Sequence, residues 1–362
     1  MPDPRAARVA ALREAVQRAH LDAVLLTSLP NIRYITGFSG SSALVMVTAR
    51  DILLISDFRY ATQVRSEVGD FARIIIDAQS IWGALFRAQA DLAGVEIAGF
   101  ESAHVLHRDV ERILSGGSRW QWRATTDLVE GLREQKDAGE VAAIAAAVEV
   151  AERALSRTLD EVRTGMTELQ VAGLLEHALR DAGSRGFPFD TIVASGPRAA
   201  LPHARPDDRE VQRGDLLLID FGAIVDGYCS DITRTVVMGR ASDEQRAVHA
   251  IVRGANEAAS AGVRAGMRGQ DADAIARRYI EERGQGDAFG HGLGHGIGLE
   301  VHEAPRLART ADGVLPTGAV VTIEPGIYRE GWGGVRVEDD VVLGAGGPRR
   351  LTTFSHELLE IG

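Results

Sequence analysis

The sequence predicts an α/β domain over residues 1–132, followed over residues 133–362 by a second domain in which a sheet is flanked by paired helices. The first observation behind this prediction is length, because 362 residues exceed one typical domain and are enough to bury two cores. The second is the alternation of apolar strand-like runs with helical patterns in the first third of the chain. The third is a charged segment, Leu132–Glu140, that leads into a long alanine-rich helix and marks the domain boundary.

The first domain alternates helix and strand from its beginning. Val9, Leu12, Val16 and Ala19 fall on one face of a helix, and Asp22–Ser28 then has the composition of a buried strand. Four further runs suit strands, and two stretches between them suit helices. The strands are expected at Ala43–Thr48, Ile52–Ser56, Arg73–Ile76 and Val95–Phe100, and the helices at Tyr60–Val68 and Ile81–Leu92. No GxGxxG loop or other phosphate-binding turn occurs here, so this domain gives no indication of a nucleotide site.

The second domain begins with a helix from Glu140 to about Val162. Its apolar residues do not sustain a heptad over several turns, so a packed amphipathic helix is a better interpretation than a coiled coil. The order of helix, Arg-x-Gly-Met and helix then occurs twice. The two copies are Arg163–Met166 before the helical stretch Glu168–Arg180, and Arg264–Met267 before Asp271–Glu282. This repeat predicts two related halves, with a site where the halves meet.

The composition argues against several classes of protein. The formal net charge of −11 is unlike that of a non-specific nucleic-acid binder, which carries a basic surface. No apolar run approaches the roughly 20 residues that a membrane-spanning helix needs, so we expect no membrane role. The single cysteine, Cys229, cannot form an internal disulfide. The arginine-rich beginning lacks the apolar run of a signal peptide, and we therefore expect a cytoplasmic protein.

The segment Leu216–Arg234 carries two candidate site residues, Asp220 and Asp231. The run Leu216–Ile219 is too apolar for an exposed strand and leads directly to Asp220, and a buried carboxylate without a partner is costly. Asp220 is therefore a metal ligand, a proton carrier or half of an ion pair. A turn at the Asp-Gly pair between the two aspartates would fold the segment into a β-hairpin and bring both carboxylates to one site.

Histidines form the second group of candidates. His203 follows the expected strand Phe189–Gly196, and alone it would most simply be a histidine of a loop or of the core. The segment 291–302 holds His291, His295 and His302 among four glycines. So much glycine weakens a strand by roughly 0.5 to 1 kcal/mol per position, which indicates close approach of the backbone to a ligand. The alternative is a flexible glycine loop that carries surface histidines.

Two further acids, Glu324 and Glu338, complete the set. Each follows or lies within an apolar strand-like run, so both are expected to point from strand ends into a shared space. Individually each would suit an ordinary salt bridge, with Arg336 as an obvious partner. The full set is Asp220, Asp231, His295, Glu324 and Glu338. Four carboxylates and one imidazole suit a pair of hard or borderline divalent metals, and a bridged metal pair indicates hydrolysis.

Several segments of the chain match a known family when they are taken together. In the second domain they are FDTIVASG with ALPH, LIDFGAIVDGYCSDITRT, HGLGHGIGLEVHE, TIEPGIY and GGVRVEDD, and in the first NIRYITGFSGSSA and SDFRYATQ. In this set and order the chain resembles the pita-bread metallopeptidases, specifically the aminopeptidase P and prolidase group that cleaves Xaa-Pro bonds. The resemblance implies a creatinase-type α/β amino-terminal domain before an α+β pita-bread catalytic domain with pseudo-twofold halves.

The resemblance also implies how the candidate ligands would be used. Asp220 would bind one metal ion, and His295 with Glu324 would bind the other. Asp231 and Glu338 would bridge the two ions, and a hydroxide between the ions would attack the scissile carbonyl. The ions would be two manganese ions, with cobalt or zinc as alternatives. No ligand position departs from the family pattern.

The remaining candidates are implied to act on the substrate. Glu324 would carry a proton as well as bind metal, and His203 and His302 would contact the substrate carbonyls and the tetrahedral intermediate. His291 matches the histidine beside the proline pocket of the family, and Arg336 matches a residue that orients substrate or ligands. The substrates would be peptides with proline at the second position, and a homodimer is a family expectation.

We expect an Xaa-Pro aminopeptidase that acts on peptides, because the SDFRYATQ segment and the compact first domain favour it. The nearest alternative is prolidase, an Xaa-Pro dipeptidase restricted to dipeptides, which the second domain resembles equally well. A non-catalytic binding protein and a metal-independent creatinase-like hydrolase fit less well, because both normally lose metal ligands. A methionine aminopeptidase shares the chemistry of the second domain, but the large first domain and the ALPH segment argue against it.

Overall fold

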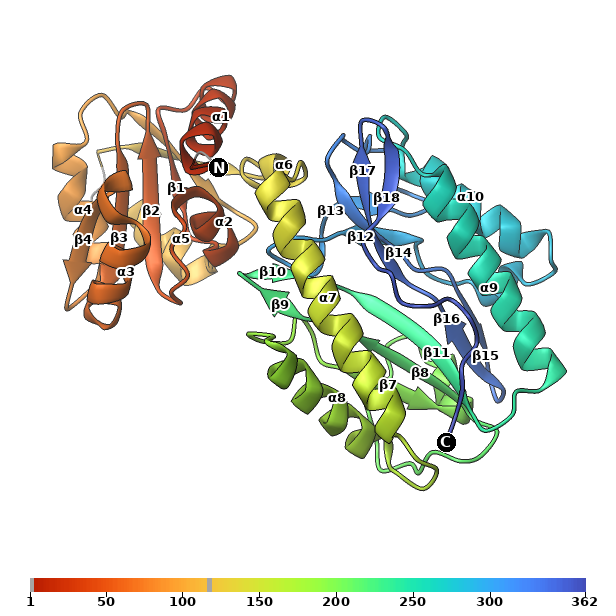
Figure 1. Ribbon diagram of the computed structural model, residues 1–362. Helices are drawn as coiled ribbons and strands as arrows, with labels where there is room; N and C mark the ends of the chain where they lie inside the picture. Colours follow the sequence, from red (N-terminus) through yellow and green to blue (C-terminus); the bar gives the residue numbers. More distant parts are fainter. Residues whose placement is uncertain (1–2, 116–118) are drawn as a thin grey trace. The chain divides into compact units, whose positions relative to one another are not determined.

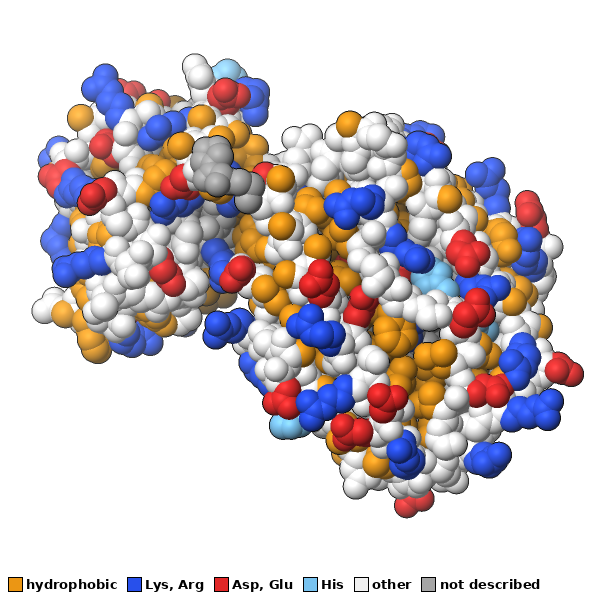
Figure 2. Space-filling model, in the orientation of Figure 1, with side chains coloured by type: hydrophobic (Ala, Val, Ile, Leu, Met, Phe, Trp, Pro, Cys, Tyr) orange, Lys and Arg blue, Asp and Glu red, His pale blue; other side chains and the backbone are white. Residues whose placement is uncertain are grey.

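The computed structural model describes residues 3–115 and 119–362, and the chain divides into two compact units (Figure 1). We call residues 1–133 the amino-terminal unit and residues 134–362 the carboxy-terminal unit. No helix in the described part of the chain is long and apolar enough to cross a membrane. On the face drawn in Figure 2, basic and acidic side chains are interspersed over each unit, which is unlike the basic stripe of a nucleic-acid binder.

The amino-terminal unit is built on a six-stranded mixed sheet in the order β4-β3-β2-β1-β5-β6. Its strands are β1 (Ala23–Leu26), β2 (Ala43–Thr48), β3 (Ile52–Asp57), β4 (Arg73–Asp77), β5 (Ile97–Glu101) and β6 (Gln121–Thr125). Its helices are α1 (Arg5–Arg18), α2 (Leu29–Thr36), α3 (Ala61–Glu67), α4 (Ile81–Ala88), α5 (His107–Ser115) and α6 (Glu130–Arg133). Every residue of β1 and β2 is buried, as continuous apolar runs predict for central strands covered on both faces.

The predicted α/β character of this unit is confirmed, and four of its elements, α2, α5, β6 and the short α6, were not predicted. Helix α2 has Pro30 in its first turn and ends at Gly37, whose φ of 83° allows the left-handed C-cap. Its eight residues are too few to display a clear helical period. Helix α5 is mostly exposed, and the edge strand β6 buries none of its residues fully, so neither has a strong apolar pattern.

The carboxy-terminal unit contains two larger sheets, each covered by a pair of helices (Figure 1). Helices α7 (Ala138–Glu161) and α8 (Glu168–Ala182) pack on the sheet β19-β11-β8-β7. Helices α9 (Asp243–Gly262) and α10 (Gly269–Glu281) pack on the sheet β13-β12-β14-β17-β18. We call the first of these sheets, with α7 and α8, the first half of the unit. The second sheet, with α9 and α10, is the second half.

The strands of this unit also include two hairpins outside these sheets. The first-half strands are β7 (Ile192–Ser195), β8 (Leu216–Phe221), β9 (Ile224–Val225), β10 (Tyr228–Cys229) and β11 (Ile232–Met238), to which β19 (Glu360–Ile361) adds. The second-half strands are β12 (Gly294–Gly296), β13 (Glu303–Leu307), β14 (Val320–Ile323), β15 (Gly326–Arg329), β16 (Gly333–Arg336), β17 (Asp339–Gly344) and β18 (Gly347–Arg350). Strands β9 and β10 form one hairpin, and β15 and β16 the other.

The repeated Arg-x-Gly-Met segment joins the paired helices in each half and has one conformation. Gly165 and Gly266 have φ of 89° and 87°, which glycine adopts without strain. The amide of Gly165 donates to Val211 O at 2.9 Å, and the amide of Gly266 donates to Leu315 O at 2.8 Å. The glycine in the repeat is therefore required by the turn, and the predicted pseudo-twofold halves are confirmed.

Candidate metal centre

One cavity of about 770 Å³ in the carboxy-terminal unit contains all the site residues predicted from the sequence. They are His203, Asp220, Asp231, His291, His295, His302, Glu324, Arg336 and Glu338. Both halves contribute, because the two aspartates come from the first sheet and the two glutamates from strand ends of the second half. The predicted shared space between the halves is therefore present.

The two aspartates are placed by the antiparallel pair β8 and β11. Asp220 lies opposite Thr233 in this ladder. Side chains alternate between the faces of a strand, so Asp231, two residues before Thr233, projects from the same face as Asp220. The amide of Asp231 donates to Asp340 Oδ2 at 3.1 Å, which fixes the end of the strand. The hairpin expected from the sequence thus brings both carboxylates to one face.

The other three candidate ligands come from separate strands of the second half. His295 lies in β12, Glu324 follows β14, and Glu338 lies between β16 and β17. His295 Nε2 is 3.5 Å from Glu324 Oε1 and 3.8 Å from Asp231 Oδ2. Asp231, His295 and Glu338 each offer one ligand atom within 4.8 Å of the others. Candidate metal ligands of both halves therefore converge.

Two glycines beside His295 allow a close approach between strands. A Cβ on Gly294 would lie 2.0 Å from Thr322 O, and a Cβ on Gly296 would lie 2.1 Å from Ala304 O. Strand β12 lies between β13 and β14, so only glycine fits beside the neighbouring backbones. His295 therefore lies in a paired strand rather than in the alternative glycine loop, and the approach of the backbone to a ligand stays a prediction.

The buried carboxyl groups of the cavity favour the binding of a cation. Burial raises the pKa of Asp231 and of Glu338 well above the usual range, and the surrounding carboxylates raise both further. Burial raises the pKa of Glu324 to about 8. Asp220 Oδ1 is buried and has no hydrogen-bond partner among the described residues. A hard divalent cation would satisfy these oxygens, so the donor set fits the metal ions that the sequence indicates.

Arg336 is held in one orientation by four acceptors. Its guanidinium donates to Asp220 Oδ2, to Thr233 Oγ1 at 2.9 Å, to Tyr328 Oη at 2.8 Å and to Pro202 O at 3.3 Å. The salt bridge considered from the sequence was with Glu324 or Glu338, whereas the structure pairs Arg336 with Asp220. The guanidinium thus reaches across the face that carries Asp220.

Two residues of the site, Thr233 and Tyr328, were missed by the sequence reasoning. Thr233 Oγ1 donates to Glu338 Oε2 at 2.6 Å. Tyr328 Oη lies 3.0 Å from His291 Nε2. A signal for Thr233 existed, because it lies two positions after Asp231 on the same strand face. Tyr328 belongs to the TIEPGIY segment that was singled out for Glu324 alone.

The four histidines differ in exposure. Burial lowers the pKa of His291 and of His295 to about 4, so both rings are neutral near pH 7. His302 is exposed, and its ring centre is 4.3 Å from that of His295. His203 is also exposed in the same cavity. The two exposed rings are available to a substrate, whereas the two partly buried rings are part of the wall.

A buried ion pair anchors the segment that carries His302. Lys136 Nζ lies 2.6 Å from Glu303 Oε1, and the two side chains are only 1% and 7% exposed. Breaking such a pair by removing one partner leaves an uncompensated buried charge. Lys136 belongs to the charged segment Leu132–Glu140, and Asp137 of the same segment begins α7 as its N-cap. The segment at the domain boundary therefore also supports the cavity.

Comparison with known proteins gives two family matches. Residues 142–345 match metallopeptidase family M24, and residues 8–135 match the creatinase/prolidase N-terminal domain. An Xaa-Pro dipeptidase of Pyrococcus horikoshii is 34% identical over 97% of this chain and 98% of its own length.

Two solved structures are similar over nearly the whole chain. An Xaa-Pro dipeptidase from Bacillus anthracis has a TM-score of 0.95 and 37% identity, covering 99% of this chain and 100% of that one. An X-Pro aminopeptidase from Thermotoga maritima has a TM-score of 0.90 and 39% identity, covering 98% of this chain and 99% of that one.

Proposed function

The chain belongs to metallopeptidase family M24 and is a metallo-exopeptidase, and from this premise we propose that it is an Xaa-Pro dipeptidase with two divalent metal ions. The sequence alone favours an Xaa-Pro aminopeptidase, but the relatives named as dipeptidases support the alternative better. The observation that carries the proposal is the convergence of Asp231, His295 and Glu338 in one cavity with Asp220 and Glu324.

We assign the ligands as the family resemblance implies. Asp220 would hold one ion, His295 and Glu324 would hold the other, and Asp231 and Glu338 would be shared by both ions. The buried Oδ1 of Asp220 and the raised pKa values of the other three carboxylic acids support this assignment. When bound, two divalent ions lower the pKa of water to near neutrality and polarise a carbonyl oxygen. Manganese is the proposed metal, with cobalt and zinc as alternatives.

The protein groups around the ligands bind and orient the substrate. His203 and His302, which are exposed in the cavity, donate hydrogen bonds to the substrate carbonyl oxygens, where negative charge develops. Glu324 accepts a proton and passes it to the leaving nitrogen, because its carboxylate lines the cavity where the substrate would lie. The neutral ring of His291 forms part of the wall for the proline ring, and Arg336 keeps Asp220 and Tyr328 in place.

A cation in the cavity wall supports a dipeptide substrate. Arg306, in β13, lines the cavity, and its side chain makes no hydrogen bond or ion pair with other described residues. The free carboxylate of an Xaa-Pro dipeptide would be neutralised by such a guanidinium, whereas a longer peptide places its carboxylate elsewhere. We assign Arg306 to the recognition of this carboxylate.

The test is a substrate-length series with the purified protein and added manganese. We expect turnover of Xaa-Pro and much less turnover of Xaa-Pro-Xaa and longer peptides. Equal turnover of the longer peptides would favour an Xaa-Pro aminopeptidase, the second candidate, which the similarity to the Thermotoga maritima structure supports. Absence of hydrolysis with manganese, cobalt and zinc would contradict both and leave a non-catalytic binding protein. Size-exclusion chromatography in the same experiment checks the expected homodimer.

A further inference from the structure

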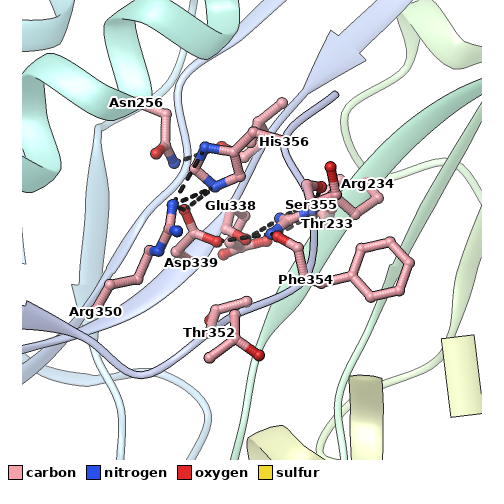
Figure 3. Close-up of polar contacts among 12 residues, drawn as sticks. Thr233, Arg234, Asn256, Glu338, Asp339, Arg350, Thr352, Phe354, Ser355 and His356 are labelled. Carbon is pink, nitrogen blue, oxygen red and sulfur yellow. Dashed lines mark hydrogen bonds and ion pairs between the residues drawn. The ribbon is translucent and has the colours of Figure 1, made fainter. Parts of the chain in front are cut away.

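Two residues outside the cavity hold the backbone beside Glu324 and Glu338. The first is Asn256 in α9, which is fully buried (Figure 3). Its side-chain Nδ2 donates to Ile323 O at 2.8 Å and to Val337 O at 3.1 Å. These are the residues immediately before Glu324 and Glu338. One amide group therefore joins the two chain segments that carry these acids.

The main chain also joins these segments, through the ladder between β14 and β17. Ile323 lies opposite Asp339 at the end of this ladder, and the same register continued by one residue would place Glu324 opposite Glu338. Beyond the ladder, the amide of Val337 lies 3.5 Å from Pro325 O, at the long limit of a hydrogen bond. Asn256 thus adds a side-chain link between the two segments at the point where the ladder ends.

The second residue is Arg234 in β11, whose buried guanidinium uses all five of its N–H donors (Figure 3). The acceptors are Glu338 O at 2.6 Å, Thr233 O at 2.9 Å, Asp339 Oδ1 at 2.8 Å, Phe354 O at 2.9 Å and Ser355 O at 3.0 Å. The carbonyl of Glu338 itself is therefore fixed to the strand that follows Asp231.

An ion-pair network keeps the guanidinium of Arg234 in this position. Asp339 is fully buried, and its Oδ2 lies 2.7 Å from His356 Nε2. Arg350 Nη1 lies 3.8 Å from the same oxygen. The buried positive charge of Arg234 is thus compensated by a carboxylate that is itself held from its other side. A buried pair of this kind tolerates little displacement, because each charge depends on its partner.

We propose that Asn256 and Arg234 form a carbonyl clamp, which sets the positions of Glu324 and Glu338 and so the affinity for metal. The proposal rests on the metal centre proposed above. Neither residue touches substrate or the ligand carboxylates, so both are positioning residues. Ligand groups must be held to within about 0.5 Å of their productive geometry, and substitution of their supporting partners typically costs roughly 10- to 100-fold in metal affinity.

The experiment compares metal affinity in three forms of the full-length protein. Asn256→Leu keeps the volume of the side chain and removes both donors. We expect its affinity for Co²⁺ and Mn²⁺, measured by chelator competition, to fall roughly 10- to 100-fold. The visible absorption spectrum of the cobalt-loaded protein should also change, because a displaced Glu338 alters the coordination of the ion.

Asn31→Leu is the matched control. Asn31 is a fully buried asparagine whose Nδ2 also donates two hydrogen bonds, to Glu101 at 2.7 Å and to Glu130 at 2.6 Å, in the amino-terminal unit. We expect this variant to lose stability but to retain the metal affinity and cobalt spectrum of the wild type. An equal loss of affinity in the two variants would overturn the clamp, because the effect would then be a general one of buried amides.

A second variant, Arg234→Lys, tests the carbonyl clamp if Asn256→Leu does not fold. Arg234→Lys keeps the positive charge beside Asp339 but cannot serve five acceptors, so a smaller loss of affinity in the same direction is expected. Wild-type affinity in a folded clamp variant, with folding checked by circular dichroism, would overturn the clamp alone. A wild-type protein that neither binds metal nor cleaves Xaa-Pro would instead contradict the proposed function.

Discussion

The two halves of the carboxy-terminal unit repeat one order of helices, but the strands that carry their acidic side chains are supported differently. In the first half, Asp220 and Asp231 belong to two adjoining strands, and the hydrogen bonds of that ladder set their spacing. In the second half, Glu324 and Glu338 lie just beyond the end of the ladder between β14 and β17. There Asn256 reaches both backbones from a helix and adds a side-chain link.

This difference shows where each half is sensitive to substitution. A ladder of main-chain hydrogen bonds survives most changes of side chain, because the backbone supplies the bonds. A contact made by one buried amide is lost with a single substitution. We therefore expect the first half to lose metal mainly through its ligands themselves, and the second half to lose it through supporting residues as well.

The largest expected effect comes from the proposed bridging ligands, one from each half. Asp231→Ala and Glu338→Ala should each lower kcat/KM by about 1000-fold or more and remove bound metal together with activity, because metal ions contribute several kcal/mol to the barrier reduction. Metal analysis and kinetics check this.

The control for these variants is Asp226→Asn in the turn of the same first-half hairpin. Asp226 is exposed and has a φ of 47°, a conformation that asparagine also tolerates. It should leave both metal content and activity unchanged. Full activity in a metal-free Asp231→Ala protein would refute a shared centre between the halves.

The next effect concerns which half recognises the free carboxylate of a dipeptide. Arg306→Ala should raise KM for an Xaa-Pro dipeptide roughly tenfold with little change in kcat, because it removes a charge-assisted hydrogen bond worth about 1.5 kcal/mol. Arg205 lines the same cavity from the first half and is the matched control. If Arg205→Ala raises KM and Arg306→Ala does not, the carboxylate belongs to the first half.

The pH dependence of stability should also distinguish the halves. Burial lowers the pKa of His249, in α9, to about 4, from 6.5 for a free histidine. The unfolded chain thus binds the proton more readily, so the stability contributed by the neutral ring is present above pH 6.5 and is lost as the pH falls towards 4. The slope is at most about 1.4 kcal/mol per pH unit for one proton.

His249→Leu should therefore flatten the acid side of the stability curve, measured by denaturant unfolding between pH 7 and pH 4.5. The matched variant in the first half is His177→Leu, in α8, whose side chain is 68% exposed. It should leave the slope as in the wild type. Equal slopes for the wild type and the His249 variant would contradict the neutral buried state of this ring.

The smallest effects should be equal in the two halves. Thr167 caps α8 and Ser242 caps α9, each in a capping box with a glutamine three residues later. Replacing either by alanine should lower the free energy of unfolding by about 1 kcal/mol and leave metal affinity unchanged. Differential scanning calorimetry and chelator competition check both. A loss of metal from only one variant would mean that the helix start in that half also supports the centre.

The sequence predicts those features of the site that depend on local pattern. Asp220 and Asp231 could be placed together because a hairpin brings near residues into contact, and the paired halves could be inferred because Gly165 and Gly266 occupy equivalent turns. The contacts of Asn256 and Arg234 with residues 323–355 could not, since these partners lie 67 to 121 positions away and follow no period. The preference for an aminopeptidase also had only motifs to rely on, and these motifs do not encode substrate length.

The ion pair between Lys136 and Glu303 has a consequence for dividing the protein. Lys136 lies only two residues after Glu134, where the carboxy-terminal unit begins, yet its ammonium group supports the segment that carries His302. A protease that cuts between the units at Arg133 would leave Lys136 on the larger fragment. A cut after Lys136 would remove the ammonium group from that fragment and break its ion pair with the buried carboxylate of Glu303. Any attempt to obtain the second unit alone should therefore keep the chain from Glu134 onward.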